Sequence, residues 1–517
     1  MQDSTKTGNE LPKVRPQSDY LYERRGPWPQ PQPAHPFGFA PGVVHVPKDE
    51  ARRWRWHIGL RYIWTTLTYW PNAAWYAWTH RSLEPVNDEQ FEDILTHSSL
   101  SKFLSRELNE RDKYPHNEKL TIFKEFLDKE PNERFFVSDF SLMKHLISYP
   151  GIYTAATMTL FKGDRVNGRR KVVAIYFYDT QKMFTPDDGN AWDLAKYFVL
   201  QGGAVRISSS AHANLHFPYD SINAISKSSL PKDSVLLRLL LPHFDLTLEL
   251  DHDVLNSPIS PVLNKQFLPY TAFPADADGL AGLFLYGYNG MADNPSYPHF
   301  KFHAVPDSRN YPSDYGDFLM AYYDTILHFV NQVIPLIPKD EYVDIRVWTD
   351  YINTWVPEFP DHEEFFDAND NLIEKEVDLP SNKKVYVLAE TVANIIWDLS
   401  VGHAADHYDY SNLNINQVPL RLRVPPPESK EVPALDRRAM IHWVDLFKHH
   451  FERKMFFAPR NVTLLEDIDY QFDGPGEHER TLRELNKQFL EDLKKTEKNL
   501  KVYNYIPLNQ ISRSIQY

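Results

Sequence analysis

Two pairs of histidines have the spacing of a metal site. His212 and His216 are four residues apart, and so are His403 and His407. On an α-helix this spacing places both imidazoles on one face, about one turn apart. Two helices that each present two inward ligands can hold a metal ion in a helical core. Because the chain has 21 histidines, such pairs also arise by chance as hydrogen-bonded core or surface residues, and that alternative stays open.

The composition excludes several other kinds of chemistry. The 517 residues include no cysteine, which excludes disulfides, zinc–thiolate sites, iron–sulfur clusters and thiol catalysis. The formal net charge of −14 argues against a sequence-independent nucleic-acid binder and against an electrostatic membrane anchor. No apolar run is long enough to predict a transmembrane helix, and the N-terminus lacks a signal-peptide pattern. The expected location is cytoplasmic, and the sequence leaves the oligomeric state open.

Apolar residues at helical spacing dominate the chain after residue 190. The second histidine pair lies late in the apolar segment 385–408, so its side chains are expected to be buried. Further helices are predicted over residues 191–200, 233–244, 317–337, 343–356 and 480–500. The pattern predicts a mainly α protein with a few short strands, one of them over residues 171–178.

The N-terminal part of the chain differs from the rest. Residues 1–48 are polar and rich in proline, which predicts an extended arm, with a disordered tail as the alternative. Residues 51–83 are dense in Trp and Tyr and are predicted to form a packed pair of helices broken at Pro71, rather than an aromatic ligand cage. Residues 88–147 are predicted as alternating short helices. With no repeat and only short linkers, residues 49–517 are predicted to form one large domain.

Several short motifs resemble, in the same order, those of the lipoxygenase catalytic domain. They include AWDLAK at the start of a helix, a PH-x-x-LTLEL run, and IW followed by HAADH in the second histidine segment. The motifs lie at residues 191–196, 238–250, 311–316, 344–355, 396–407, 420–427 and 505–517. The resemblance covers roughly residues 50–517 and implies a large helical catalytic domain. The stretch before residue 50 is too short for the N-terminal β-sandwich that many eukaryotic lipoxygenases carry.

The resemblance implies a set of metal ligands and a reaction. Carried over by position, the ligands are His212, His216, His403, His407 and the terminal carboxylate of Tyr517. Neutral imidazoles and one carboxylate suit a non-haem iron that cycles between Fe(II) and Fe(III), and manganese would fit the same donors. The family removes a hydrogen atom from a polyunsaturated fatty acid and adds O2, which gives a hydroperoxide.

Some positions depart from the family pattern. The first histidine pair is four rather than five residues apart, which suits ordinary α geometry, and Pro218 should break or kink that helix. Either His212 or His216 could therefore be displaced from the metal. The chain ends in Tyr517 where the family ends in Ile, and the alternative is a frayed tail that does not ligate.

Two further departures concern the surroundings of the metal. Val254 lies where the family usually has Ala or Gly, so it is expected to restrict O2 or substrate beside the metal, unless it is a plain core residue. Asp406, Asp409 and Tyr410 replace groups that are mostly apolar or amide in the family. A carboxylate here could orient a ligating histidine, or it could lie on the solvated side of the helix.

Three functions follow from these observations. The first is a lipoxygenase-like dioxygenase that acts on a polyunsaturated fatty acid. The second is a specialised oxidase or hydroxylase on the same scaffold, acting on a different apolar metabolite. The third is a metal-free lipid-binding relative in which the histidine pairs serve only packing, because a fold does not fix a function.

Overall fold

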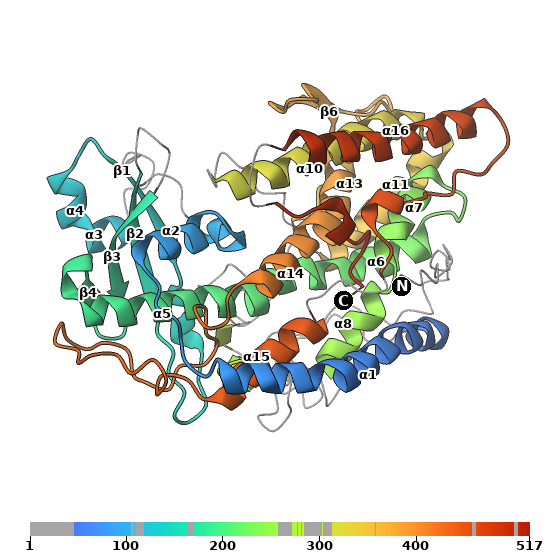
Figure 1. Cartoon of the computed structure of the whole chain (residues 1–517). Coiled ribbons are helices and arrows are strands. Elements are labelled where there is room, and N and C mark those ends of the chain that lie inside the picture. The colour runs from blue at the N-terminus through green and yellow to red at the C-terminus, as the bar shows by residue number, and fades with distance from the viewer. Residues whose placement is uncertain are drawn as a thin grey trace.

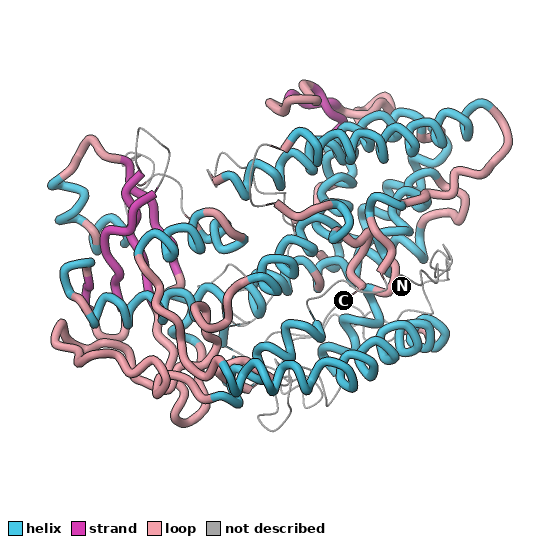
Figure 2. The backbone as a smooth tube through the Cα atoms, in the orientation of Figure 1, coloured by secondary structure: helices cyan, strands magenta, loops and turns pink. Residues whose placement is uncertain are grey.

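Helices make up most of the chain in this computed structural model (Figures 1 and 2). The structure describes residues 46–104, 108, 118–163, 170–256, 271–276, 278–280, 282–283, 302, 313–356, 358–456, 462–500 and 505–516. The arm predicted over residues 1–48 therefore lies outside the described residues, except for its last three. None of the described helices is both long and apolar enough to cross a membrane.

Short strands interrupt the helices in two places along the chain. The helices are α1 (Lys48–Thr79), α2 (Asp88–Thr96), α3 (Glu118–Ile122), α4 (Lys124–Lys129), α5 (Asn190–Arg206), α6 (Phe217–Ser229), α7 (Val235–Leu240), α8 (Thr247–Asn256), α10 (Asp314–Val333), α11 (Tyr342–Trp355), α12 (His362–Phe365), α13 (Val387–Trp397), α14 (His403–Asn412), α15 (Trp443–Phe456) and α16 (Glu477–Asn499). The strands are β1 (Arg134–Asp139), β2 (Thr157–Gly163), β3 (Arg170–Phe177), β4 (Lys182–Phe184), β5 (Glu374–Glu376) and β6 (Lys384–Tyr386).

The strands form two small antiparallel sheets. β1 to β4 pair in sequence order, and β5 pairs with β6 as a separate hairpin. In Figure 2 the first sheet lies at the left of the molecule, and the hairpin lies apart from it at the top. The predicted strand over residues 171–178 is confirmed as β3, and the mainly α prediction is confirmed for the described residues.

Two details of the N-terminal prediction are wrong. Residues 88–147 are not all short helices, because residues 134–139 form β1. Its four central residues are all buried, and a short, fully buried apolar run has the same pattern in a strand as in a helix. Nor does Pro71 divide the aromatic segment, since α1 continues through it. Buried residues on both sides of the proline, Thr65 and Ala73, hold the helix against the protein, so packing outweighs the loss of one backbone hydrogen bond.

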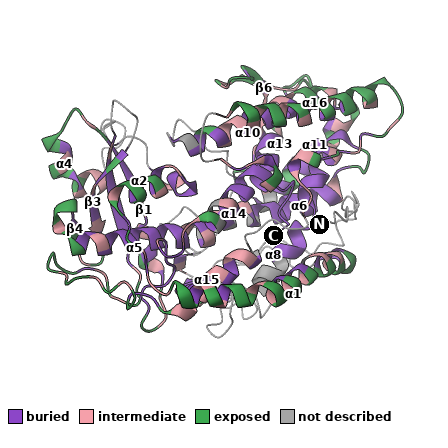
Figure 3. Cartoon of the chain, viewed as in Figure 1, coloured by how far each residue is buried: buried purple, intermediate pink, exposed green. Residues whose placement is uncertain are grey.

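Two large hydrophobic clusters form the interior, and the histidine pairs lie where they meet. The sheet-side cluster contains one of the two buried faces of the four-stranded sheet and most of α5, and the helical cluster contains the inner faces of α6, α10, α11, α13 and α16. The first histidine pair lies between α5, which belongs to the sheet-side cluster, and α6, which belongs to the helical cluster. The second pair follows α13 of the helical cluster and precedes Tyr410 of α14, which belongs to the sheet-side cluster. Figure 3 shows α5 and α13 largely buried, whereas much of α16 is exposed. The two segments with histidine pairs thus cross between the clusters in opposite directions.

α15 contains a buried carboxyl group that the rest of the fold holds in place. Glu452 on α15 accepts a hydrogen bond of 2.6 Å from the backbone N–H of Ala272. Burial raises the pKa of Glu452 to about 8, although this hydrogen bond and the charges of Arg421 and Lys448 oppose the rise. The folded protein therefore keeps Glu452 protonated over a pH range in which the unfolded chain ionises it.

We expect the Glu452→Gln variant to become more stable relative to the wild type as the pH rises. Between the ordinary pKa of 4.5 and the folded value of about 8, unfolding of the wild type releases one proton from this carboxyl. Its free energy of unfolding should then fall by roughly 1.4 kcal/mol per pH unit from this group, and the amide should abolish that fall. Urea unfolding of both proteins at roughly pH 5, 6 and 7 measures the difference. Glu491→Gln on the exposed face of α16 is the control, and a difference that does not grow with pH would contradict the assignment.

Candidate metal centre

The first histidine pair follows an interruption of the helix. α5 ends at Arg206, residues Ile207–Ala211 form a π-helical turn, and residues His212–Leu215 form a 3₁₀ turn. α6 then begins at Phe217 with Pro218 in its first turn, where the missing N–H of proline costs nothing. The expectation of ordinary α geometry for this pair is therefore wrong, and the break expected at Pro218 is confirmed. The wide π turn and the tight 3₁₀ turn rotate the two imidazoles toward the interior.

The second pair also follows a π-helical turn. α13 ends at Trp397, residues Asp398–Gly402 form the π turn, and α14 begins at His403. A Cβ on Gly402 would lie 2.8 Å from the ring of Trp397, so no larger residue fits this turn without a shift. His403 and His407 are one turn apart on α14, as the sequence predicts.

The four histidines meet in the interior. One nitrogen of each of His212, His216, His403 and His407 lies within 4.8 Å of those of the others, and all four residues are buried. The Nε2 atom of His212 is 2.9 Å from Nε2 of His216 and 2.8 Å from Nε2 of His407. The ring of His403 is centred 4.3 Å from that of His407. The structure thus brings both members of the first pair together with the second pair.

These distances suit a shared cation better than hydrogen bonds. An imidazole nitrogen has one in-plane position, which holds either a proton or a lone pair. Nε2 of His212 faces two other nitrogens at hydrogen-bond distance, and one such position cannot serve both. Two ligands at right angles around an ion with bonds of about 2.0–2.1 Å lie about 2.8–3.0 Å apart. The four imidazoles therefore fit a metal ion.

Two buried carboxylates stand behind the first pair. Asp251 on α8 lies 2.6 Å from Nδ1 of His216, and Asp406 lies 3.5 Å from Nδ1 of His212. A carboxylate that accepts the Nδ1 proton fixes the tautomer and leaves the Nε2 lone pair for a metal. Asp406 is also paired with Lys102 and lies in the interior, so the alternative that it faces solvent is wrong. The side chain of Asp409 lies outside what the structure describes.

The surroundings favour the neutral, metal-binding form of the histidines. Burial lowers the pKa of His212, His403 and His407 well below the ordinary value, and the neighbouring histidines lower it further. Behind Asp251, burial and the charge of Asp251 raise the pKa of Asp220 well above its ordinary value. A protonated Asp220 can donate a hydrogen bond to Asp251 and leave that carboxylate free to accept from His216.

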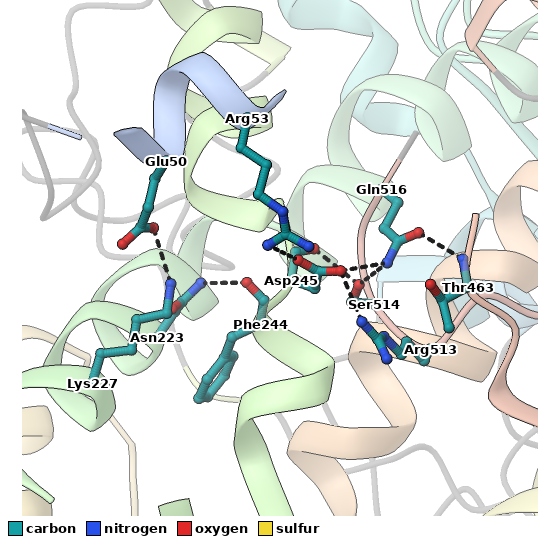
Figure 4. Close-up of polar contacts among 10 residues, drawn as sticks. All are labelled: Glu50, Arg53, Asn223, Lys227, Phe244, Asp245, Thr463, Arg513, Ser514 and Gln516. Carbon is teal, nitrogen blue, oxygen red and sulfur yellow. Dashed lines mark hydrogen bonds and ion pairs between the residues drawn. The ribbon is translucent and has the colours of Figure 1, made fainter. Parts of the chain in front are cut away.

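The C-terminal tail is anchored inside the protein by Asp245 (Figure 4). The Asp245 carboxylate pairs with Arg513 at 3.0 Å and with Arg53 of α1 at 2.7 Å, and it accepts a hydrogen bond of 3.3 Å from Gln516. Ser514 donates to the Asp245 carbonyl at 2.9 Å. Residues 511–516 are all buried. The tail is therefore not frayed as far as residue 516.

The tail passes close to the histidines. Arg61 of α1 donates to the carbonyl of Gln516 at 3.5 Å, and its charge is among the influences that lower the pKa of His407, after burial and the neighbouring histidines. Tyr517 lies outside the described residues, so its ligand role stays a prediction. Val254 lies on α8, but its side chain is outside what the structure describes.

Sequence reasoning missed Asp251 and Asp245. Nothing in the spacing of these residues relates them to the histidines, because α8 reaches the site through its packing against α6 and α1. The backbone turns sharply between these two residues, because Leu246, directly after Asp245, has a φ of 65°, which a bulky residue rarely adopts. This left-handed turn separates Asp245, which holds the tail, from α8, which supplies Asp251.

We expect Asp245→Ala to destabilise the protein strongly. The variant would leave the Arg513 guanidinium, which is 1% exposed, buried without its carboxylate, and breaking such a pair costs about 3–5 kcal/mol. Arg53→Gln is the matched control, because its side chain is 36% exposed and an exposed pair contributes about 0–1 kcal/mol. Urea unfolding measures both variants, and equal losses of stability would show that Asp245 does not anchor the tail.

Comparisons with known proteins define the fold. Neither a protein-family profile nor a curated protein sequence matches the chain. Solved structures do match. A coral 8R-lipoxygenase superimposes with a TM-score of 0.62 at 15% identity, over 97% of this chain and 80% of its own.

Two other solved structures agree with this match. A lipoxygenase in complex with arachidonate has a TM-score of 0.63 at 15% identity, over 97% of this chain and 80% of its own. The manganese lipoxygenase of Gaeumannomyces graminis has a TM-score of 0.63 at 14% identity, over 96% of this chain and 93% of its own. The chain thus has the fold of a lipoxygenase catalytic domain, with a buried group of four histidines that could hold a metal ion.

Proposed function

We propose that this protein is a non-haem metal oxygenase that converts a polyunsaturated fatty acid to its hydroperoxide. The observation that carries the proposal is the convergence of four buried imidazoles, with Asp251 and Asp406 behind two of them. The lipoxygenase fold supports the class of reaction, and a similar structure that holds arachidonate supports the class of substrate. In the overall reaction one C–H bond of the substrate breaks and O2 is added, so the product contains every atom of both reactants.

The metal ligands in this proposal are His212, His216, His403, His407 and the terminal carboxylate of Tyr517. Imidazole and carboxylate donors suit both iron and manganese. When bound, such a metal supplies the one-electron chemistry that removes a hydrogen atom from the weak C–H bond between two double bonds. Burial of the four histidines excludes bulk water, which protects a substrate radical from side reactions.

The chain's other residues keep the ligands in place. Asp251 holds the ring of His216 through Nδ1, and Asp406 faces Nδ1 of His212 while it is itself paired with Lys102. Asp245 fixes the tail as far as residue 516, through Arg513 and Gln516. The alternative of a metal-free packing role gives no reason for carboxylates to face the histidines from outside while the Nε2 atoms face one another.

The metal is the first point to test. We expect about one iron or manganese ion per chain by inductively coupled plasma mass spectrometry, because one set of histidines can hold one ion. His403→Ala should lose the metal, whereas Asp251→Ala should weaken metal binding by about 10–100-fold, because it removes only a carboxylate that orients a ligand. His478→Ala, on the exposed start of α16, should retain it. Absence of metal after anaerobic loading with Fe(II) or Mn(II) would favour the metal-free lipid-binding alternative.

The reaction is tested with linoleate and O2. We expect O2 uptake together with a rise in conjugated-diene absorbance, and neither should occur in His403→Ala. A short extension after Tyr517 should abolish both signals, because the carboxylate would move away, whereas the same extension at the N-terminus should leave them intact. Retained activity with the C-terminal extension would refute the terminal ligand. Uptake of O2 with another apolar substrate and without a conjugated diene would instead indicate the oxidase or hydroxylase.

A further inference from the structure

The outer face of α1 carries most of the exposed large hydrophobic residues in the part of the chain that the structure describes. Of the 13 large hydrophobic residues that are exposed there, eight lie on this one helix. They are Trp56, Leu60, Ile63, Trp64, Leu67, Trp70, Trp75 and Trp78, and each is at least half exposed. We call these eight residues the outer stripe. Soluble proteins rarely expose so continuous an apolar patch without a partner.

The spacing of the outer stripe matches one side of the helix. Residues 56, 60, 63, 67 and 70 follow one another at intervals of four and three, which keeps their side chains on one side. α1 has 32 residues, so the helix extends for about 48 Å. It lies along one edge of the molecule, and Figure 3 shows exposed residues along its length. The stripe is therefore long and narrow, as a helix lying in a surface plane requires.

The opposite face of α1 is firmly attached. Tyr69 lies 2.6 Å from Nε2 of His450 on α15, and the ring of Tyr76 stacks on the same imidazole at 4.3 Å between centroids. Ala73 is fully buried against Phe451 of α15. The outer stripe consequently belongs to a helix that is fixed to the body of the protein, not to one that is loosely attached.

Charge identifies the kind of partner. Residues 51–83 contain five arginines and no Asp or Glu, although the whole chain has a net charge of −14. Arg53 and Arg61 are turned inward toward Asp245 and Gln516, whereas Lys48, Arg52 and Arg55 are exposed at the start of the stripe. The exposed charged residues at the start of α1 are the cations Lys48, Arg52 and Arg55 and one carboxylate, Asp49, so a second copy of this chain would bring more positive than negative charge to the interface. A partner with negative charge and an apolar interior suits the surface better.

The residue types agree with a lipid surface. Tryptophan favours the boundary between headgroups and acyl chains, where its ring is both apolar and polar. Exposed Arg and Lys beside an apolar stripe attract anionic lipids. A hollow of about 700 Å³ opens beside the first half of α1, and its described lining includes Arg52, Arg55, Trp56 and Leu60.

We propose that the outer stripe of α1 docks the protein onto an anionic membrane surface, with Lys48, Arg52 and Arg55 near the headgroups and the tryptophans at the interface. The chain's net charge argued against an electrostatic membrane anchor, but the average over 517 residues conceals this local basic helix. The inference does not depend on the proposed reaction, because it rests on a face of α1 that is turned away from the histidines.

The experiment is flotation of the full-length protein with vesicles. The vesicles are phosphatidylcholine alone or with about one-third phosphatidylglycerol. We expect the wild type to float with the anionic vesicles, and its tryptophan emission to be quenched by brominated acyl chains in them. Substituting Trp64, Trp70 and Trp75 together by Gln should lower vesicle binding at least about tenfold.

Two further variants separate the contributions. Arg52→Gln with Arg55→Gln should lower binding to anionic vesicles about tenfold or more and leave binding to neutral vesicles unchanged. The matched control places three glutamines on exposed apolar residues of α11, at Val343, Val347 and Tyr351, and should bind as the wild type does. Thermal melts followed by circular dichroism verify that every variant is folded.

Three results would overturn the proposal. The first is failure of the wild type to float with anionic vesicles. The second is an equal loss of binding in the α11 control. The third is a dimer, seen by light scattering, that the tryptophan variant dissociates while no protein binds vesicles, because the stripe would then cover a second copy of the chain. Metal content and O2 uptake are measured separately, so the two proposals can fail independently.

Discussion

The convergence of four buried histidines on one place is the constraint on which the structure depends. Each must be buried, because solvent would stabilise its protonated form, and each must be held in one tautomer. The histidines are buried where two hydrophobic clusters meet, and the hydrogen bond between Asp251 and Nδ1 of His216 fixes one of the rings, while Asp406 faces Nδ1 of His212 at 3.5 Å. The π turns before His212 and His403 are then explained, since both chain segments must turn a histidine inward at the same boundary.

The ion pairs of Asp245 stabilise the part of the interior that contains the C-terminal tail. Asp245 joins α1, the start of α8 and the C-terminal tail through Arg53 and Arg513. α1 consequently has two separate roles. Its inner face contributes Arg53 and Arg61 to the surroundings of the tail, whereas its outer stripe presents tryptophans to the solvent. One helix thereby connects the surface proposed to meet lipid with the interior proposed to oxidise it.

The sequence predicted the helical architecture and the four histidines, because both leave a periodic pattern in a few neighbouring residues. It predicted the wrong local geometry for His212 and His216, since a π turn and a 3₁₀ turn compensate each other and their combination has no simple sequence pattern. It also missed Asp251 and Asp245, because their proximity to the site depends on how α8 packs. Strand β1 was mistaken for a helix, since a short buried apolar run has the same appearance in either.

The Asp245 contacts also bear on the order in which the chain can fold. Arg513 follows Asp245 by 268 residues, and closing so long a loop costs entropy before the contact repays it. During synthesis, α1 and Asp245 exist well before residues 513–516. In that interval Asp245 has only Arg53 as a cationic partner among the contacts described, and the neighbouring interior has not received its last segment. Arrival of the tail is thus expected to be a late folding step, and nascent chains stalled before residue 513 should be open to proteolysis in α8.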